Sequence, residues 1–206
     1  MRLAVLAPGF CVESGFASKV VKLMGLLQSL GHNLGLVRVR GDVDGLYRLI
    51  VRQARQPQFY ASCGVPDTVG GRFDMIALHA YIVLRRLKEL GSRQERFSQA
   101  LYDRMFADLD YNLREMGVGD LSVGRKIKDL TKLFQGRINA YDTALAGSTQ
   151  ALEDALIRNA YADATPPEGA AARLGRYVQS AIAHSRDWSA EDLTAARIAF
   201  PTPSDD

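Results

Sequence analysis

The chain has 206 residues, of which 47% are hydrophobic and 24% are charged, a balance typical of one compact globular domain. Its formal net charge of +3 is too small to indicate nucleic acid or an anionic membrane as a partner. No stretch approaches the roughly 18 uninterrupted apolar residues of a membrane-spanning helix, and Cys11 and Cys63 lack the spacing of a disulfide framework or a zinc site.

The first 43 residues are the hardest part to interpret. Apolar residues from Ser18 to Leu30 predict a helix that stops at Gly31, and Leu34–Arg40 is the only β-like run. We expect residues 1–43 to be a divergent extension or a misannotated leader. Residues 44–186 are expected to form a helical domain, and the proline-broken, acidic residues 187–206 a frayed tail.

From Asp44 onward the pattern is almost wholly helical. Asp44 can cap a helix that must end before Pro57, because the residue preceding a proline avoids the helical conformation. A short helix begins at Pro57, and a loop rich in glycine and proline follows. Phe73–Leu90 is apolar on nearly every side, which indicates the buried centre of a helical bundle.

The next two helices are amphipathic and are joined by a Gly-Val-Gly turn. Helical spacing predicts that Phe97–Met116 buries one stripe, and Gly117 is suited to end that helix. The stripe contains Phe97, Leu101, Met105, Leu109, Leu113 and Met116. Ser122 is the expected cap of the following helix, whose inward residues are Val123, Ile127, Leu130, Phe134 and Ile138.

Further helices are expected near Ala151–Tyr161 and Gly169–His184, and Ser189 with Asp192 has the spacing of a capping box. The predicted fold is therefore all-α, a compact bundle of about six to eight helices with an irregular N-terminal extension.

Charged residues gather on the outer sides of the two amphipathic helices, and we predict that they bind a partner. The acidic helix and its turn contribute Asp103, Asp108, Asp110, Arg114, Glu115 and Asp120. The basic helix contributes Arg125, Lys126, Lys128, Lys132 and Arg137. Two simpler explanations stay open: Arg104–Asp108 and Asp110–Arg114 are spaced for pairing within a helix, and the basic run can be a solvated face. Lysines of this kind could also serve as plain charge toward anionic lipid headgroups or ribosomal RNA phosphates.

Residues for catalysis are scattered. His32, His79 and His184 are isolated, and His79 in the most apolar helix is expected to be a core histidine with one hydrogen-bond partner. Cys63 has no base nearby in sequence, and the Gly-Val-Gly turn lacks the ending of a phosphate-binding loop. We predict no enzymatic activity, no cofactor, no metal site and no binding to DNA.

Three segments carry a resemblance to a known family. They are ARQPQFYASCGVPDTVGGRFDMIALHAYIVLRRL from Ala54, FADLDYNLREMGVGDLSVGRKIKDLTKLFQGRINAYDTAL from Phe106, and the weaker ALIRNAYAD from Ala155. From Leu46 to about Tyr161 the chain resembles the ubiquinol-cytochrome c chaperone family. The LREMGVGDLSV block is the most specific part of this resemblance.

The resemblance implies a non-enzymatic assembly chaperone for respiratory complex III, in the cytoplasm and peripheral at the inner membrane. In mitochondrial relatives, on the matrix side, it implies binding of newly made cytochrome b, contact with the ribosome and a small helical partner protein. A peripheral lipid- or quinone-binding module remains an alternative, and it would need an apolar cavity. A hydrolase or metal enzyme is a third, and it predicts stoichiometric metal.

Overall fold

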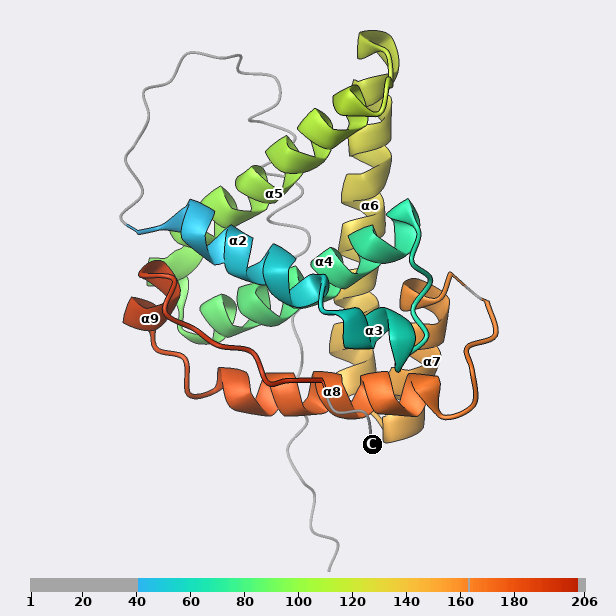
Figure 1. Ribbon diagram of the computed structural model, residues 1–206. Helices are drawn as coiled ribbons and strands as arrows, with labels where there is room; N and C mark the ends of the chain where they lie inside the picture. The colour runs from blue at the N-terminus through green and yellow to red at the C-terminus, as the bar shows by residue number, and fades with distance from the viewer. Residues whose placement is uncertain (1–40, 163, 204–206) are drawn as a thin grey trace, which may run out of the picture. The chain divides into compact units, whose positions relative to one another are not determined.

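The computed structural model describes residues 41–162 and 164–203 (Figure 1). The expected helix Ser18–Leu30, the β-like run Leu34–Arg40 and almost all of the expected extension lie outside these residues. Within them the regular secondary structure is helical and contains no strand, which confirms the predicted all-α fold.

The helices follow one another with short connections. Their bounds are α2 Val43–Ala54, α3 Pro57–Ala61, α4 Val69–Glu89, the 3-10 helix η1 Ser92–Gln94, α5 Glu95–Glu115, α6 Asp120–Leu145, α7 Thr149–Ala160, α8 Ala170–Ser185 and α9 Ala190–Thr194. Helix α4 packs against α2, α5, α6, α7 and α8, so it forms the centre of the bundle. Leu78 and Ile82 on α4 are fully buried, as the apolar run predicted.

Two predicted caps are wrong. Helix α2 is capped by Asp42, whose Oδ1 accepts from the Gly45 amide at 2.7 Å, while Asp44 lies in the first turn. Helix α6 begins after Gly119, so Ser122 lies inside its first turn. The observed caps lie two residues before Asp44 and three residues before Ser122, which is an ordinary uncertainty at helix ends.

His79 is a buried core histidine, as predicted, but it has two partners. Its Nδ1 lies 2.7 Å from the Met75 carbonyl oxygen, which can only accept, so Nδ1 donates and Nε2 accepts from the Tyr177 hydroxyl at 2.8 Å. Gln53 Nε2 then donates to the Tyr177 hydroxyl and to the Pro201 carbonyl, each at 3.1 Å. This chain of hydrogen bonds joins α2, α4, α8 and the C-terminal segment.

The C-terminal segment is packed through residue 203, although a frayed tail was expected. Trp188, Leu193 and Ile198 are buried, and the predicted capping box of Ser189 and Asp192 is present at the start of α9. After α9 the chain runs back alongside α8 (Figure 1), where the Phe200 ring lies 5.2 Å from His79 and 5.1 Å from Trp188. Burial of single apolar side chains in an irregular segment leaves no helical period in the sequence, which is why the pattern missed it.

Candidate partner-binding hairpin

Helices α5 and α6 form a hairpin whose closed end projects past the other described helices (Figure 1). The base of the hairpin is part of the core, because Phe134 of α6 packs against Tyr102 and Phe106 of α5, with its ring centroid 5.8 and 6.1 Å from theirs. The bundle therefore holds one end of the hairpin and leaves the other end to solvent.

The turn at the closed end is a Schellman motif. The Val118 amide donates to the Leu113 carbonyl at 3.0 Å, and the Gly117 amide donates to the Arg114 carbonyl at 2.9 Å. Gly117 has a φ of 81°, the left-handed conformation that glycine adopts without steric cost. The prediction that Gly117 ends the helix is confirmed.

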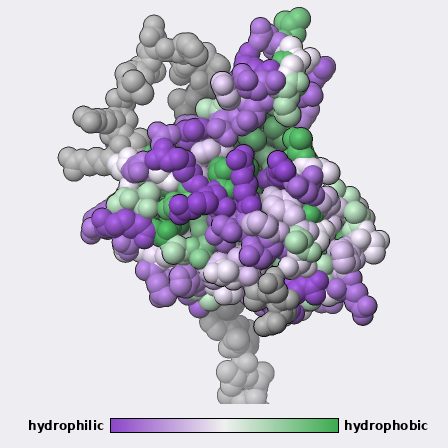
Figure 2. Space-filling model, viewed as in Figure 1, coloured by the Kyte–Doolittle hydropathy of each residue, from purple (hydrophilic) through white to green (hydrophobic). Residues whose placement is uncertain are grey.

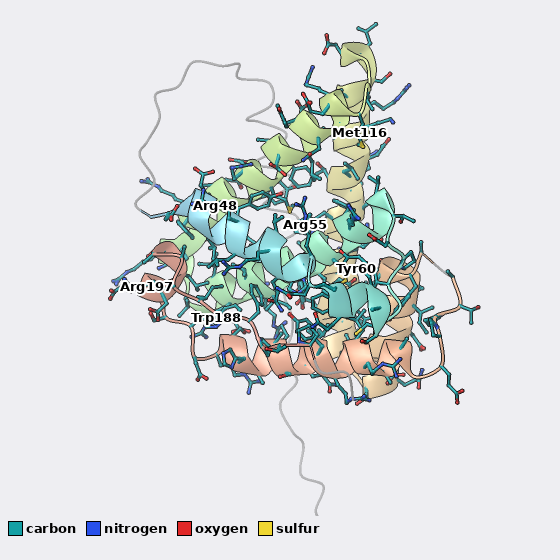
Figure 3. The ribbon with its side chains drawn as sticks, viewed as in Figure 1. Arg48, Arg55, Tyr60, Met116, Trp188 and Arg197 are labelled. Carbon is teal, nitrogen blue, oxygen red and sulfur yellow. The ribbon has the colours of Figure 1, made fainter. Side chains whose placement is uncertain are left out.

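The apolar stripe predicted for α5 is buried only in its first half. Phe97, Leu101 and Met105 are buried, whereas Leu109 and Leu113 are half-buried and Met116 is 53% exposed. The predicted stripe is wrong at its end because the hairpin extends beyond the helices that would cover it. Met116 is labelled near the closed end in Figure 3.

Exposed large hydrophobic residues concentrate on this hairpin. Of the five among the described residues, Val69 lies on α4, and the others are Tyr111 (62% exposed), Met116, Leu121 (100%) and Leu133 (51%). Figure 2 shows apolar surface at the hairpin end and in the angle between the hairpin and the body. Such clustering on a protein surface typically marks an interaction site.

Asp108, predicted to bind a partner, is occupied within the molecule. Its carboxylate accepts from the Tyr47 hydroxyl at 3.0 Å and from Asn112 Nδ2 at 3.0 Å, and Arg104 Nη1 lies 3.4 Å away, as the helical spacing predicted. Arg104 also reaches Asp44 on α2 at 2.6 Å. Burial is the larger cause that raises the pKa of the Tyr47 hydroxyl, and the nearby Asp108 carboxylate raises it further. The hydroxyl therefore stays protonated and remains a donor. This cluster fastens α5 to α2.

Asp110 and Asp120 are tied together through Arg114. Arg114 Nε lies 2.6 Å from Asp110, the second predicted helical pair, and its Nη1 also contacts Asp120 at the start of α6. The two carboxylates and one guanidinium therefore connect the helices across the turn. Among the other predicted acidic residues, Asp103 accepts from Gln99 at 2.7 Å, and Glu115 is exposed.

Arg137 was expected outside, and the structure places it inward. Its side chain is 11% exposed and forms an ion pair with Asp74 of α4, whose side chain is 6% exposed. The guanidinium also lies over the Phe73 ring, 5.2 Å from its centroid. A helical period alone cannot reveal a buried charge partner that is 63 residues away. Arg137 therefore holds α6 to α4.

The four other cations of α6 are exposed, and no salt bridge within the described ranges engages them. At about 100° of rotation per residue, Arg125, Lys128 and Lys132 align with Leu121 on the side opposite the buried Val123 and Phe134. We call Leu121, Arg125, Lys128 and Lys132 the outer stripe. Lys126 falls on a different side.

A second side of the hairpin is marked by its contacts with the body. Asp108 faces α2 and Arg137 faces α4, so these positions define the side on which α2 and α4 pack. Tyr111 and Glu115 continue that side of α5 toward the turn, and Leu133 and Lys126 continue that side of α6. We call Tyr111, Glu115, Lys126 and Leu133 the open side.

The sequence interpretation missed a basic face on α2. Arg48, Arg52 and Arg55 are exposed, on the side of the helix away from the buried Leu46 and Ile50. Arg48 and Arg55 are labelled in Figure 3. Their spacing in LYRLIVRQAR is the signal that could have revealed them.

The described residues form a shallow depression where a small ligand could bind. This depression of about 400 Å³ lies between α6 and α7, and its lining includes Asn139, Asp154 and Arg158. It lacks the enclosed apolar character that a quinone would require. In the part of the chain that the structure describes, no three His, Cys, Asp or Glu side chains are grouped as metal ligands would be.

A family model described as "Ubiquinol-cytochrome C chaperone" matches residues 61–200. The chain belongs to this family. Ubiquinol-cytochrome-c reductase complex assembly factor 1 of Xenopus laevis is 25% identical over 114 residues, which are 55% of this chain and 57% of that protein. The mitochondrial protein CBP3 of Saccharomyces cerevisiae is 30% identical over 154 residues, 67% of this chain and 46% of that protein.

A solved structure carries the same family resemblance. The crystal structure of the Cbp3 homolog from Brucella abortus matches with a TM-score of 0.70 at 34% identity, covering 89% of this chain and 97% of that chain. The chain spans about half the length of the curated relatives it matches. A chaperone family implies a non-enzymatic role. Within the described residues, no helix combines the length and apolar character needed to span a bilayer.

Proposed function

We propose that the chain is an assembly chaperone for ubiquinol-cytochrome c reductase, and that it binds newly made cytochrome b through the α5–α6 hairpin. The observation that carries this proposal is the match of the chaperone family model over residues 61–200. The names of the Xenopus and other vertebrate relatives, assembly factors of the same reductase, support the choice of complex.

The open side of the hairpin suits a helical client. On this side α2 and α4 already pack against the lower part of the hairpin, so a client helix laid above them extends an existing bundle. Tyr111 and Leu133 supply exposed apolar contact area. A membrane-protein helix carries Lys or Arg flanks on its cytoplasmic side, and Glu115 can meet such a flank.

This role places the chaperone in the cytoplasm, peripheral at the inner membrane, where its client is inserted. The resemblance also supports a ribosome contact and a small helical partner. The chaperone releases cytochrome b when haem and neighbouring subunits are added. Of the predicted partner-binding residues, Glu115 and Lys126 belong to the open side, while Asp108 and Arg137 act by holding the hairpin to the body.

Capture of cytochrome b tests the proposal. The tagged chain is recovered from solubilised membranes, and bound cytochrome b is measured by immunoblot. The double variant Tyr111→Ser with Leu133→Ser should lose most of the captured cytochrome b, because it removes the apolar contacts of the open side. Val69→Ser, which removes an exposed hydrophobic residue of α4, is the matched control and should capture normally.

Two results would contradict the proposal. One is a wild-type chain that recovers no cytochrome b from cells making the complex. The other is a serine double variant that folds and captures cytochrome b as well as the wild type. Circular dichroism of the variants separates loss of binding from loss of fold.

A further inference from the structure

The outer stripe of α6 combines one apolar residue with three cations, and none of these residues belongs to the proposed client site on the open side. Leu121 is fully exposed, and Arg125, Lys128 and Lys132 follow it in one line along the helix, with no salt bridge in the described residues. From Leu121 to Lys132 the line is about 16 Å long. It points away from the core residues Val123 and Phe134, so a partner can reach it without moving the body.

The end of the hairpin adds a second feature. Met116 before the turn and Leu121 after it are both exposed, and Val118 in the turn is half-buried. Asp110 and Asp120 close to this end both contact Arg114, and Glu115 on the open side is exposed. The end therefore exposes two large apolar side chains, Met116 and Leu121, and the cations of the outer stripe begin one turn behind Leu121.

We propose that the hairpin end and the outer stripe dock on an anionic bilayer surface, with Met116 and Leu121 entering the headgroup boundary and the three cations contacting lipid phosphates. This inference rests on the proposed function, because a membrane-protein client brings its chaperone to a bilayer. It adds which surface faces the lipid and leaves the open side of the same hairpin for the client.

The pattern favours a bilayer over the other partners that cations can bind. An apolar residue exposed over its whole side chain gains from entering a lipid interface, whereas RNA would reward exposed aromatic rings for stacking. A second copy of the chain would bring two like-charged stripes together, which opposes docking through this face. Lipid phosphates complement all three cations on one plane.

Vesicle sedimentation with the purified full chain tests the inference. The wild type should bind vesicles of phosphatidylcholine mixed with phosphatidylglycerol, bind phosphatidylcholine alone far less, and lose binding as salt rises. Replacing Arg125, Lys128 and Lys132 together with Gln should weaken binding roughly 100-fold, since each cation near an anionic surface contributes about a fivefold factor. Leu121→Ser should weaken it roughly tenfold.

The basic face of α2 provides a matched control. Replacing Arg48, Arg52 and Arg55 together with Gln lowers the net charge by the same amount and changes a stripe of similar spacing. This variant should bind vesicles nearly as the wild type does. Equal losses in both triple variants would mean that net charge alone drives binding, and the inference would be wrong.

A second outcome also overturns it. If the wild type stays in the supernatant when anionic vesicles are sedimented, but retards polyuridylate in a gel, the outer stripe is a nucleic-acid surface. The vesicles contain no cytochrome b, so failure here leaves the client proposal standing. Normal vesicle binding by a chain that captures no cytochrome b would instead contradict the proposed function.

Discussion

Asp108 shows how a residue suggestive of partner binding can be structural. Tyr47 is almost fully buried, and its hydroxyl donates to Asp108. Replacing Asp108 with Ala leaves that buried donor without its acceptor, so we expect a loss of about 1–2 kcal/mol in the free energy of unfolding. Urea unfolding followed by circular dichroism measures it.

Two companion variants make the result interpretable. Asp110→Ala, which removes only an exposed pair with Arg114, should leave the unfolding midpoint nearly unchanged. Tyr47→Phe in the Asp108→Ala background should recover part of the loss, because the unsatisfied hydroxyl is gone. An Asp108→Ala variant as stable as the wild type would show that the cluster does not hold α5 to α2.

His79 makes stability depend on pH. Burial lowers the pKa of His79 to about 4, so the unfolded chain, with a histidine pKa near 6.5, takes up the proton first. The contribution of His79 is therefore complete above pH 6.5 and is lost as the pH falls toward 4, by about 1.4 kcal/mol per pH unit within that window.

Comparison with His79→Gln isolates this effect. Gln keeps a donor and an acceptor but does not titrate, so the variant should show a flatter loss of unfolding free energy between pH 6.5 and 4.5 than the wild type. Chemical unfolding at several pH values gives both curves. Parallel curves would show that His79 is not the titrating group.

At the scale of single residues, the sequence predicted the ion pairs between residues that lie within one helical turn of each other. The pairs Arg104–Asp108 and Asp110–Arg114 lie within one turn of α5, and both form. The partners Tyr47 and Asp74 are 61 and 63 residues from the groups they bind, and no helical period encodes that distance. Whether the remaining charged residues bind a partner stays a prediction.

Among the elements, the hairpin turn depends on the backbone of one glycine. Gly117 has a positive φ, and a Cβ added there would meet no atom within 4 Å, so Gly117→Ala should act through backbone strain alone. We expect a cost of about 1 kcal/mol and faster hydrogen exchange at the Val118 amide.

Gly124 offers the opposite test on the same hairpin. It lies within α6, and its added Cβ would also meet nothing within 4 Å. Gly124→Ala should stabilise the hairpin by about 0.5–1 kcal/mol, because glycine is a poor residue inside a helix. If both variants slowed exchange equally, the left-handed turn would not be a constraint.

The elements themselves were predictable because most are long and strongly patterned. The apolar run of α4 and the periodic stripes of α5 and α6 predicted buried faces, and the core positions Leu78, Met105 and Phe134 agree. The pattern could not show where α2 and α4 stop covering the hairpin. Amphipathic spacing reports that a face is apolar and not whether another helix reaches it.

At the scale of the whole molecule, the C-terminal segment completes the core. Ile198 is buried and the Phe200 ring contacts His79 and Trp188. Deleting residues 196–206 should lower the free energy of unfolding by at least about 3 kcal/mol, because apolar area of the body becomes exposed. Thermal unfolding of the truncated chain measures it.

Arg197→Ala is the control for this deletion, since the side chain is exposed and labelled at the edge of the molecule in Figure 3. It should melt as the wild type does. A truncated chain that melts at the wild-type temperature would mean that the segment adds nothing to the core.

Helix α6 is one uninterrupted rod of 26 residues, about 39 Å long. The Asp74–Arg137 ion pair fixes it to α4 about two thirds of the way from the hairpin end. If α6 moves as a rigid helix about Arg137, its longer part ends at the hairpin turn and its shorter part ends just before α7. A displacement of the hairpin end would then produce a smaller displacement, in the opposite direction, of the end of α6 beside α7.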